Sequence, residues 1–586
     1  MNRRRRVIVA TVAGTAAVAL VAACSSSKNN NGGGGGASGA PTTGAASPGS
    51  APGMNKVIQP GFNTKGGTIN ILSDANYEHL DPVNNYVTNS GEIGRLIYRT
   101  LTFIKDTPAQ KPEIMPDLAQ KLGTPSADKK TWTYELRSGL KFEDGSPITA
   151  NDVKYAVERS FATDIYKDGA TYMTDLLENK SGYAGPYKDP TKNLDGVQTD
   201  PSDPLKITFK YASPQPESDW ILAMNYTAPV PKAKDDKQNY DFHPVSSGPY
   251  KISSYTPDKS LTLVRNPNWD QASDPNRPAL PDSFVETFGI DLPTISQRLI
   301  ADQGADKNAV TLENSGAIQN ADLPKIKDAS VQARFTNGAT PCVDYEVLNV
   351  QKIKDLNVRK AIAMAVNRQA ISTIYGGATF GSVTDTIVSP SIQSTVPNFA
   401  GPNLGLKPTG DPAAAKAMLN GQSPTIHYGV ANTSVKQKTV ATQIQNDLKA
   451  AGINVVIDQI PQSSYYKTLR SDNPPDMARA GWCWDWPTMA ATTPPVLGGN
   501  SDLTKWNANN FSMTDDTAVF KKIAADVSAG NSSGLNDITN QQLSQVWPLL
   551  PTISSNDPNV VGSNIRNGGV STIYGLIDLI TIGVQH

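Results

Sequence analysis

A single carboxylate stands among three tryptophans in the last fifth of the chain. Residues 478–489 read ARAGWCWDWPTM, where Asp485 has Trp482, Trp484 and Trp486 as near neighbours, three of the eight tryptophans of the protein. Indole rings partly shield a carboxylate from water, and a buried carboxylate needs a hydrogen-bonding or charged partner. Three interpretations are open at this point: a structural acid, a catalytic acid, or a socket for a positively charged group.

The sequence shows no recognisable partner residues that would let Asp485 act as a catalytic acid in the common hydrolytic mechanisms. Glycoside hydrolysis needs a second carboxylate nearby, and a catalytic triad needs a partnered histidine. The sequence contains neither G-x-S-x-G nor H-E-x-x-H, and its four histidines lie far apart, at His79, His243, His427 and His586. None of them stands in metal-ligand spacing. We therefore expect a protein that is not an enzyme and that uses neither a metal nor another cofactor.

The first 24 residues predict export. Residues 3–6 are four arginines, and residues 7–21 form an apolar run. That run is shorter than the ~20 residues that span a bilayer and is typical of a signal peptide, exported by the general or the twin-arginine route. It ends in Val-Ala-Ala-Cys, which resembles the lipobox of bacterial lipoproteins and implies a lipid on Cys24. An ordinary signal peptide that is cleaved elsewhere is the alternative.

Composition separates a tether from a folded part. Residues 25–63 are mostly Ser, Gly, Asn, Pro and Ala, a composition that cannot bury enough apolar surface to fold, so we expect a disordered tether. The remaining 523 residues are enough for two or more lobes with their own cores. They carry 47 basic and 54 acidic residues, a formal net charge of −7 without any basic stripe. Nucleic acid is therefore not an expected partner.

Two cysteines remain if Cys24 carries a lipid. Cys342 and Cys483 would then be an even pair in an oxidising compartment, which favours a disulfide over two free thiols. A metal site is the alternative. A disulfide would join the neighbourhood of Asp485 to a point 141 residues earlier in the chain.

The elements that must position these residues follow an α/β pattern. Thr149 and Asp152 predict a capped helix start, and Leu356 begins a predicted helix of about four turns. A predicted helix that Gly452 ends is followed at once by a strand, which is the order of an α/β unit. Residues 164–243 predict a surface subdomain rich in loops. Strands are predicted over 68–72, 131–142, 261–269 and 453–460, and helices over 149–161, 356–371 and 435–451.

Several stretches together resemble the periplasmic solute-binding proteins of ABC importers, in particular the peptide-binding family (solute-binding protein family 5). The resemblance covers residues 66–586. Its two most specific parts are the block from Trp132 to Ser160 and the block from Val358 to Ile371. The motifs that carry it are LDP (80–82), IYRTL (97–101), WTYELRSGLKFEDGSPITANDVKYAVERS (132–160), SSGPYKISSY (246–255), LVRNPNW (263–269), VRKAIAMAVNRQAI (358–371) and ARAGWCWDW (478–486).

The resemblance implies an α/β fold of two lobes that close on a ligand like a clamshell, the type II periplasmic-binding-protein fold, with an extra subdomain inserted in lobe 1. On that basis we predict the following division: signal peptide 1–24, tether 25–63, lobe 1 over 64–109 with 245–342 and 555–586, inserted subdomain 110–244, and lobe 2 over 343–554.

The resemblance also addresses the opening question. In oligopeptide binders the acid two residues after GWC receives the α-ammonium of the peptide, and Asp485 matches that acid. The family's cysteine pairing implies a disulfide between Cys342 and Cys483, and Trp482 matches an aromatic wall of the pocket. An alternating strand would place all three tryptophans opposite Asp485, so a pocket here requires an irregular backbone. Further candidate ligand contacts are Trp484, Trp486, Tyr172, Tyr77, His79 and Asn76.

The sequence departs from the family pattern around the predicted ammonium site. Trp-Pro-Thr-Met follows Asp485 where relatives often have a second acid, and Asn76 stands where some oligopeptide binders have an acid. Trp484 and Trp486 are bulkier than usual at their positions. We expect a monomer, lipid-anchored to the outer face of the cytoplasmic membrane, that binds oligopeptides or dipeptides and delivers them to ABC permease subunits. The alternative is a receptor for a non-peptide ligand such as a glycan, a siderophore, a lipid-like molecule or a signal.

Overall fold

The computed structural model describes residues 57–59, 61–106, 111–313, 317–432, 435–500, 502–507 and 512–586. The predicted signal peptide, Cys24 and most of the predicted tether lie outside these ranges. The predicted end of the tether at residue 63 is too late, because Val57 is only 3% exposed and its carbonyl accepts a hydrogen bond from Asn567 N. No helix in the described part of the chain is long and apolar enough to cross a membrane.

One mixed sheet of five strands has the order β11-β1-β10-β9-β8. Strand β1 occupies the residues predicted for it, and it pairs in parallel with β10 and β11. Ile69 and Ile71 point into the core with no exposed surface, as the alternating pattern requires. The strands are β1 (Thr68–Leu72), β8 (Tyr250–Thr256), β9 (Ser260–Arg265), β10 (Ser283–Thr287) and β11 (Ala309–Val310).

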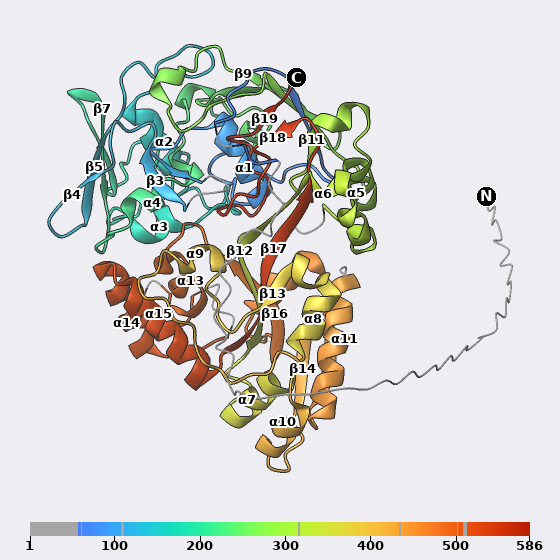
Figure 1. Ribbon diagram of the computed structural model, residues 1–586. Helices are drawn as coiled ribbons and strands as arrows, with labels where there is room; N and C mark the ends of the chain where they lie inside the picture. The colour runs from blue at the N-terminus through green and yellow to red at the C-terminus, as the bar shows by residue number, and fades with distance from the viewer. Residues whose placement is uncertain are drawn as a thin grey trace, which may run out of the picture. The chain divides into compact units, whose positions relative to one another are not determined.

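A second sheet of six strands has the order β13-β17-β12-β16-β14-β15. Its strands β12 and β17 are long and antiparallel, and Figure 1 shows them side by side through the middle of the ribbon. The predicted lobe boundaries at 342/343 and 554/555 fall inside these two strands. The strands are β12 (Phe335–Leu348), β13 (Gly381–Val383), β14 (Thr425–Ala431), β15 (Asn454–Ile460), β16 (Met477–Cys483) and β17 (Leu549–Val560).

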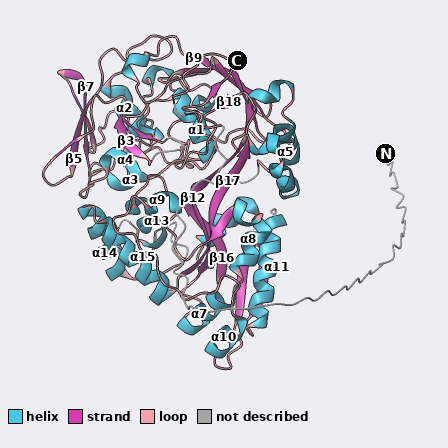
Figure 2. Ribbon diagram, viewed as in Figure 1, coloured by secondary structure: helices cyan, strands magenta, loops and turns pink. Residues whose placement is uncertain are grey.

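Helices cover the second sheet from both sides. Figure 2 shows α8 and α11 on one side of the strands and α13, α14 and α15 on the other. Strands β14 and β15 are parallel neighbours joined through α11, and Gly452 after the helix has φ +87°, so the predicted α/β unit is confirmed. The helices are α8 (Arg368–Tyr375), α11 (Val435–Ala450), α13 (Thr493–Leu497), α14 (Thr517–Ala529) and α15 (Ser532–Gln541).

The helix predicted over 356–371 is wrong as a single element. The chain forms α7 (Leu356–Ala365) and then α8, with Val366 in extended conformation between them. Asn367 causes the break, because its side chain accepts a hydrogen bond from Ala370 N and its own backbone N–H donates to Asp447 Oδ2. Asparagine is a strong helix N-cap, so a second helix begins where the apolar period alone continues the first.

A third, smaller sheet lies within residues 124–210, with the order β4-β5-β7-β6. Helix α2 (Ala150–Arg159) begins with the predicted capping box between Thr149 and Asp152. The same part of the chain holds α3 (Tyr172–Leu176) and α4 (Ser218–Ile221), which bring side chains to the site. The strands are β4 (Thr124–Pro125), β5 (Thr131–Glu135), β6 (Val197–Asp200) and β7 (Asp203–Lys210), and a hairpin of β2 (Thr102–Lys105) and β3 (Glu113–Pro116) precedes them.

Candidate functional site

The backbone around Asp485 leaves the regular strand. Strand β16 ends at Cys483, which faces Cys342 across the antiparallel pair with β12 and forms a disulfide with it. This disulfide confirms the predicted pairing. Beyond it, Trp484 N donates to Pro341 O at 3.4 Å, and the chain bends before Pro487. Asp485 is therefore not held on the face of the sheet that strand alternation alone would give it.

Two tyrosine hydroxyls bind the carboxylate of Asp485. Tyr86 Oη donates to Oδ2 at 2.9 Å, and Tyr172 Oη donates to the same oxygen. Oδ1 accepts no hydrogen bond within the described part of the chain, and no Lys, Arg or His among those residues forms an ion pair with Asp485. The carboxylate is thus hydrogen-bonded on one oxygen and uncompensated in charge.

Burial changes the acidity of this group. It raises the pKa of the Asp485 carboxyl to about 6, although the hydrogen bonds from Tyr172 and Tyr86 lower that pKa. Burial and the neighbouring charge of Asp485 together raise the pKa of both tyrosines well above the ordinary value, so the hydroxyls stay protonated and can only donate to the carboxylate. At neutral pH the Asp485 carboxyl is therefore mostly ionised.

Asp485 lines a cavity of about 340 Å³. Most of its wall is apolar or aromatic, and the remainder is Asp485, two arginines and four amide or hydroxyl side chains. That mixture of apolar walls with a few convergent polar groups is typical of small-molecule sites. The lining residues are Asn85, Tyr86, Val87, Thr88, Gly91, Arg95, Tyr98, Thr100, Phe103, Ile104, Ala223, Met224, Asn225, Arg277, Pro341, Trp482, Cys483, Trp484, Asp485, Ile573 and Tyr574.

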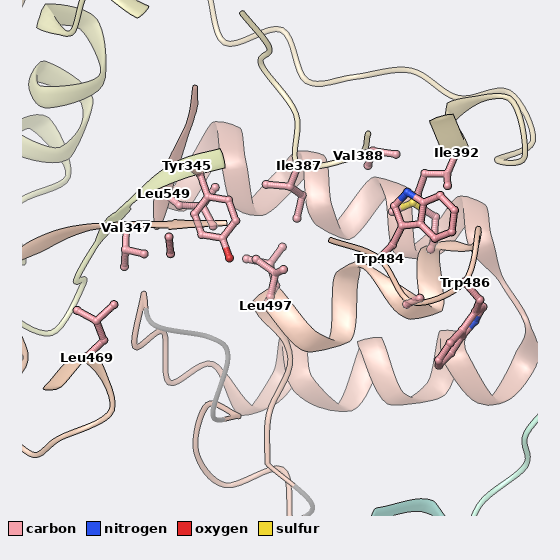
Figure 3. Close-up of a cluster of buried hydrophobic side chains, with 14 of the residues drawn as sticks. Tyr345, Val347, Ile387, Val388, Ile392, Leu469, Trp484, Trp486, Leu497 and Leu549 are labelled. Carbon is pink, nitrogen blue, oxygen red and sulfur yellow. The ribbon is translucent and has the colours of Figure 1, made fainter. Parts of the chain in front are cut away.

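The three tryptophans around Asp485 lie in different surroundings. Trp482 and Trp484 line the cavity, and their indole N–H groups are fixed by hydrogen bonds to Ala491 O and to Ser391 Oγ. Figure 3 shows Trp484 next to Ile392 in the apolar cluster. Trp486 is 3% exposed and is not part of the cavity wall.

Trp486 instead joins the loop after β16 to the subdomain predicted over residues 110–244. Its Nε1 donates to Glu217 Oε2 at 2.7 Å, and Thr488 Oγ1 donates to the same oxygen at 2.7 Å. The ring of Tyr172 packs on the ring of Trp486 with centroids 4.9 Å apart. The subdomain that carries Tyr172 and Glu217 therefore contacts the Asp485 segment through both a carboxylate and an aromatic pair.

Three candidate residues ahead of LDP lie outside the cavity wall. Tyr77 is 4% exposed and donates its hydroxyl to Glu286 at 2.7 and 2.8 Å, which is a core contact. His79 lies between Asp241 and Asp168, at 2.8 and 3.2 Å. Asn76 Nδ2 donates to the carbonyl of Tyr77 at 3.3 Å. The geometry gives none of these three a contact with the cavity at Asp485, so their predicted ligand role gains no support from it.

Tyr86, Arg95 and Glu217 are site residues that the sequence did not single out. Tyr86 lies in the loop before α1 (Thr88–Ile97), and Arg95 lies in the last turn of that helix. Nothing local distinguishes them from a loop tyrosine and a helical arginine, because Tyr86 bonds Asp485 across 399 residues and Arg95 pairs with Asp578 as well as with Glu92 of its own helix. No group of three or more His, Cys, Asp or Glu side chains in the described ranges could hold a metal ion.

Comparison with known families and sequences gives a consistent picture. Residues 113–503 match the family described as bacterial extracellular solute-binding proteins, family 5. The chain is 24% identical over 439 residues to the periplasmic oligopeptide-binding protein OppA of Salmonella typhimurium, covering 69% of this chain and 74% of the relative. It is 26% identical over 383 residues to the nickel-binding periplasmic protein of Escherichia coli, covering 61% of this chain and 65% of the relative.

Solved structures agree on the fold. The clavulanic acid biosynthesis oligopeptide binding protein 2 superposes with a TM-score of 0.81 at 27% identity, over 91% of this chain and 98% of the other. The periplasmic binding protein DppA from Helicobacter pylori, in complex with the peptide STSA, superposes with a TM-score of 0.68 at 18% identity, over 89% and 99%. The predicted two-lobe α/β architecture is confirmed by these neighbours.

Proposed function

Because the chain belongs to the bacterial extracellular solute-binding proteins of family 5, we propose that it captures oligopeptides or dipeptides at Asp485 and delivers them to the permease of an ABC importer. It catalyses no reaction in this proposal; ATP is hydrolysed by other subunits. Binding draws the lobes together, since contacts made in the closed state shift the balance between open and closed forms.

The observation that carries this proposal is the uncompensated carboxylate of Asp485. Its Oδ2 is held by Tyr86 and Tyr172, while Oδ1 accepts no hydrogen bond from the described residues. A carboxylate buried with neutral donors alone is unfavourable until a cation arrives. The α-ammonium of a peptide supplies that cation and a charge-assisted hydrogen bond. The apolar walls then accept side chains without selecting a particular sequence.

Substitution of Asp485 by Asn tests the proposal. We expect the affinity for a peptide with a free amino terminus to fall at least about tenfold, which corresponds to loss of one charge-assisted hydrogen bond. The N-acetylated form of the same peptide lacks the ammonium, so its weaker affinity is expected to change little. Isothermal titration calorimetry measures both. Asp458→Asn is the matched control, because that carboxylate lies on β15, is 43% exposed and is outside the cavity wall.

Equal affinities of the wild type and Asp485→Asn for the free peptide would contradict the proposal that Asp485 binds the peptide ammonium. Mass spectrometry of ligand that co-purifies with the protein gives an independent reading. A distribution of peptides supports the proposal, and a single non-peptide species supports a receptor for another ligand on the same fold.

The proposal places the protein outside the cytoplasm, tethered by lipid on Cys24. It rests on the apolar run of residues 7–21, the cysteine that follows it and the tether composition of the segment beyond. Cys24→Ser is expected to abolish metabolic labelling with a fatty acid and to move the protein from the membrane fraction to the soluble fraction. A variant that is still labelled would contradict the lipid assignment and leave the ligand site unaffected.

A further inference from the structure

Arg95 is the second charged group in the wall of the cavity, and its hydrogen bonding is incomplete. The side chain is 6% exposed. Its Nη1 donates to Glu92 Oε2 at 2.9 Å and to Asp578 Oδ1 at 3.3 Å, whereas Nη2 is buried without a partner in the part of the chain that the structure describes. A guanidinium keeps its protons at all physiological pH values, so Nη2 is an unused donor. A buried charged donor without an acceptor is unfavourable.

The neighbouring Arg277 shows what a purely structural arginine looks like in the same wall. Its Nε donates to Arg95 O, its Nη1 to Asp274, and its Nη2 to Tyr98 O and to Asp117. Every nitrogen of that guanidinium has a partner within the protein. Arg95 therefore differs from Arg277, because its Nη2 is buried with no hydrogen-bond partner among the described residues.

The charges around Arg95 select the kind of acceptor. Glu92 and Asp578 both pair with the guanidinium, and burial raises the pKa of the Glu92 carboxyl to about 7. One cation between two acids leaves no excess positive charge to attract a carboxylate. A neutral oxygen, such as an amide carbonyl, satisfies the donor without adding a third negative charge.

Tyr574 connects this arginine to the ammonium site. Its ring centroid is 5.4 Å from Cζ of Arg95, and it lines the same cavity. Burial raises the pKa of the Tyr574 hydroxyl to about 12, with Arg95 lowering and Asp485 raising it, so both charged groups act on this one side chain. Asp485, Arg95 and Tyr574 line one cavity of about 340 Å³, so a single ligand in that cavity lies beside all three.

We infer that Arg95 Nη2 donates a hydrogen bond to an amide carbonyl oxygen near the amino terminus of the bound peptide. The inference rests on the proposed function and sharpens it: the ligand is a short peptide whose ammonium meets Asp485 and whose backbone carbonyl meets Arg95. The cavity of about 340 Å³ is consistent with a short ligand, since small-molecule sites span about 300–1,000 Å³. A simple amine offers only the ammonium, and a simple carboxylate offers neither group.

Ligand analogues test this hydrogen bond on the wild-type protein. We use a dipeptide, its alkene isostere without the amide, and the ester analogue that keeps the carbonyl but lacks the amide N–H. We expect the alkene isostere to bind about ten- to a hundredfold more weakly than the dipeptide, and the ester to bind within about threefold of it. Equal affinity of the dipeptide and the alkene isostere would overturn the inference.

Arg95→Lys tests the protein side of the same bond. Lysine keeps a positive charge for Glu92 and Asp578 but lacks the second nitrogen of the guanidinium fork. We expect it to bind the dipeptide more weakly while its discrimination against the alkene isostere falls to about threefold or less. Discrimination as large as that of the wild type would overturn the inference.

If Arg95→Lys folds poorly, the affinities of the wild-type protein for the three analogues still test the hydrogen bond to the ligand carbonyl. The two proposals also fail differently. If the dipeptide and its alkene isostere bind equally but both require Asp485, Arg95 has no ligand contact and the ammonium site stands. If no peptide binds at all, both proposals are wrong.

Discussion

The protein buries acidic side chains in two contrasting environments. Asp117 lies between two guanidinium groups, with Oδ1 2.7 Å from Arg99 Nε and Oδ2 2.9 Å from Arg277 Nη2. Asp485 has the hydroxyls of Tyr86 and Tyr172 and no cation among the described residues. The pKa of Asp117 is lowered because those arginines outweigh its burial. The pKa of Asp485 is raised to about 6 because nothing outweighs its burial.

This difference in pairing indicates two roles: Asp117 stabilises the fold, and Asp485 is the acid for which we propose a ligand. A network whose charges are already matched has little to gain from an incoming cation. A buried acid with only neutral donors has its main electrostatic interaction still to make. Perturbed acidity in a cavity marks a functional candidate for this reason. The contrast can be tested by removing each charge in turn.

Asp117→Asn gives the largest expected effect. It leaves Arg99 and Arg277 sharing Asp274 alone, and removing one partner from a buried ion pair typically costs about 3–5 kcal/mol. Asp485→Asn removes an acid whose charged form is unfavourable in the folded state, so its free energy of unfolding is expected to stay level or rise. Urea unfolding of the ligand-free protein measures both. A loss of stability in Asp485→Asn as large as that in Asp117→Asn would show that both acids stabilise the ligand-free fold.

The pH dependence of the two acids is expected to have opposite signs. The folded pKa of Asp485, about 6, lies above its ordinary value of 3.8, so between these values the folded state binds more protons than the unfolded state. Its charge destabilises the ligand-free protein above pH 6, and that penalty disappears as the pH falls towards 4. Asp117 has a lowered pKa, so its contribution to stability is present above its unfolded pKa and is lost as the pH falls through the folded one.

Of the two acids compared, only Asp485 takes part in the proposed ligand binding. In that proposal the ammonium of a peptide meets a charged carboxylate, whose fraction falls from about nine-tenths at pH 7 to about one-tenth at pH 5 when the pKa is about 6. We therefore expect peptide affinity to fall by about tenfold between pH 7 and pH 5. Calorimetry at both pH values measures the fall. The residual affinity of Asp485→Asn should be flat over this range, and an equal pH dependence in the variant would show that another group is responsible.

The sequence singled out the acid at the centre of this comparison and one of its two hydrogen-bond partners, Tyr172. The run of indoles and the family motif pointed to Asp485, and the even pair of Cys342 and Cys483 predicted the disulfide. Tyr86 belongs to a loop near the start of the folded part and bonds Asp485 across 399 residues, and Arg95 of the following helix lines the same cavity. Their positions at the site depend on how distant segments pack, for which the local pattern holds no signal.

The same limit applies to elements. Strand β1, the capping box of α2 and the β14–α11–β15 unit follow from short-range rules of alternation, capping and helix termination. The helix predicted over 356–371 is two helices, because Asn367 caps the second one locally through Ala370 N while its backbone N–H donates to Asp447, eighty residues away. The apolar period continues through this position, so periodicity alone does not show that a new helix begins there.

Glu217 gives the smallest expected effect and refines the comparison with a third kind of acid. Burial raises its pKa, and its Oε2 accepts hydrogen bonds from Trp486 Nε1 and Thr488 Oγ1, both 2.7 Å long. These bonds join the subdomain of Tyr172 to the Asp485 segment, so we expect them to favour the closed form. Glu217→Ala removes both. We expect their combined contribution to closure to be about that of one typical hydrogen bond, 0.5–1.5 kcal/mol, so peptide affinity should fall about three- to tenfold. Calorimetry and small-angle scattering measure the affinity and the degree of closure.

Glu217→Gln separates the charge of this acid from its position. The amide oxygen can still accept from one of the two donors, so the loss should be smaller than in Glu217→Ala. Since the contact favours closure and does not touch the ammonium, free and N-acetylated peptides should weaken by the same factor. A selective loss for the free peptide, like that expected of Asp485→Asn, would mean that Glu217 serves the ammonium site itself. Glu217 and Asp485 would then both bind the ammonium. The comparison would have to set this pair of acids, in place of Asp485 alone, against the ion-paired Asp117.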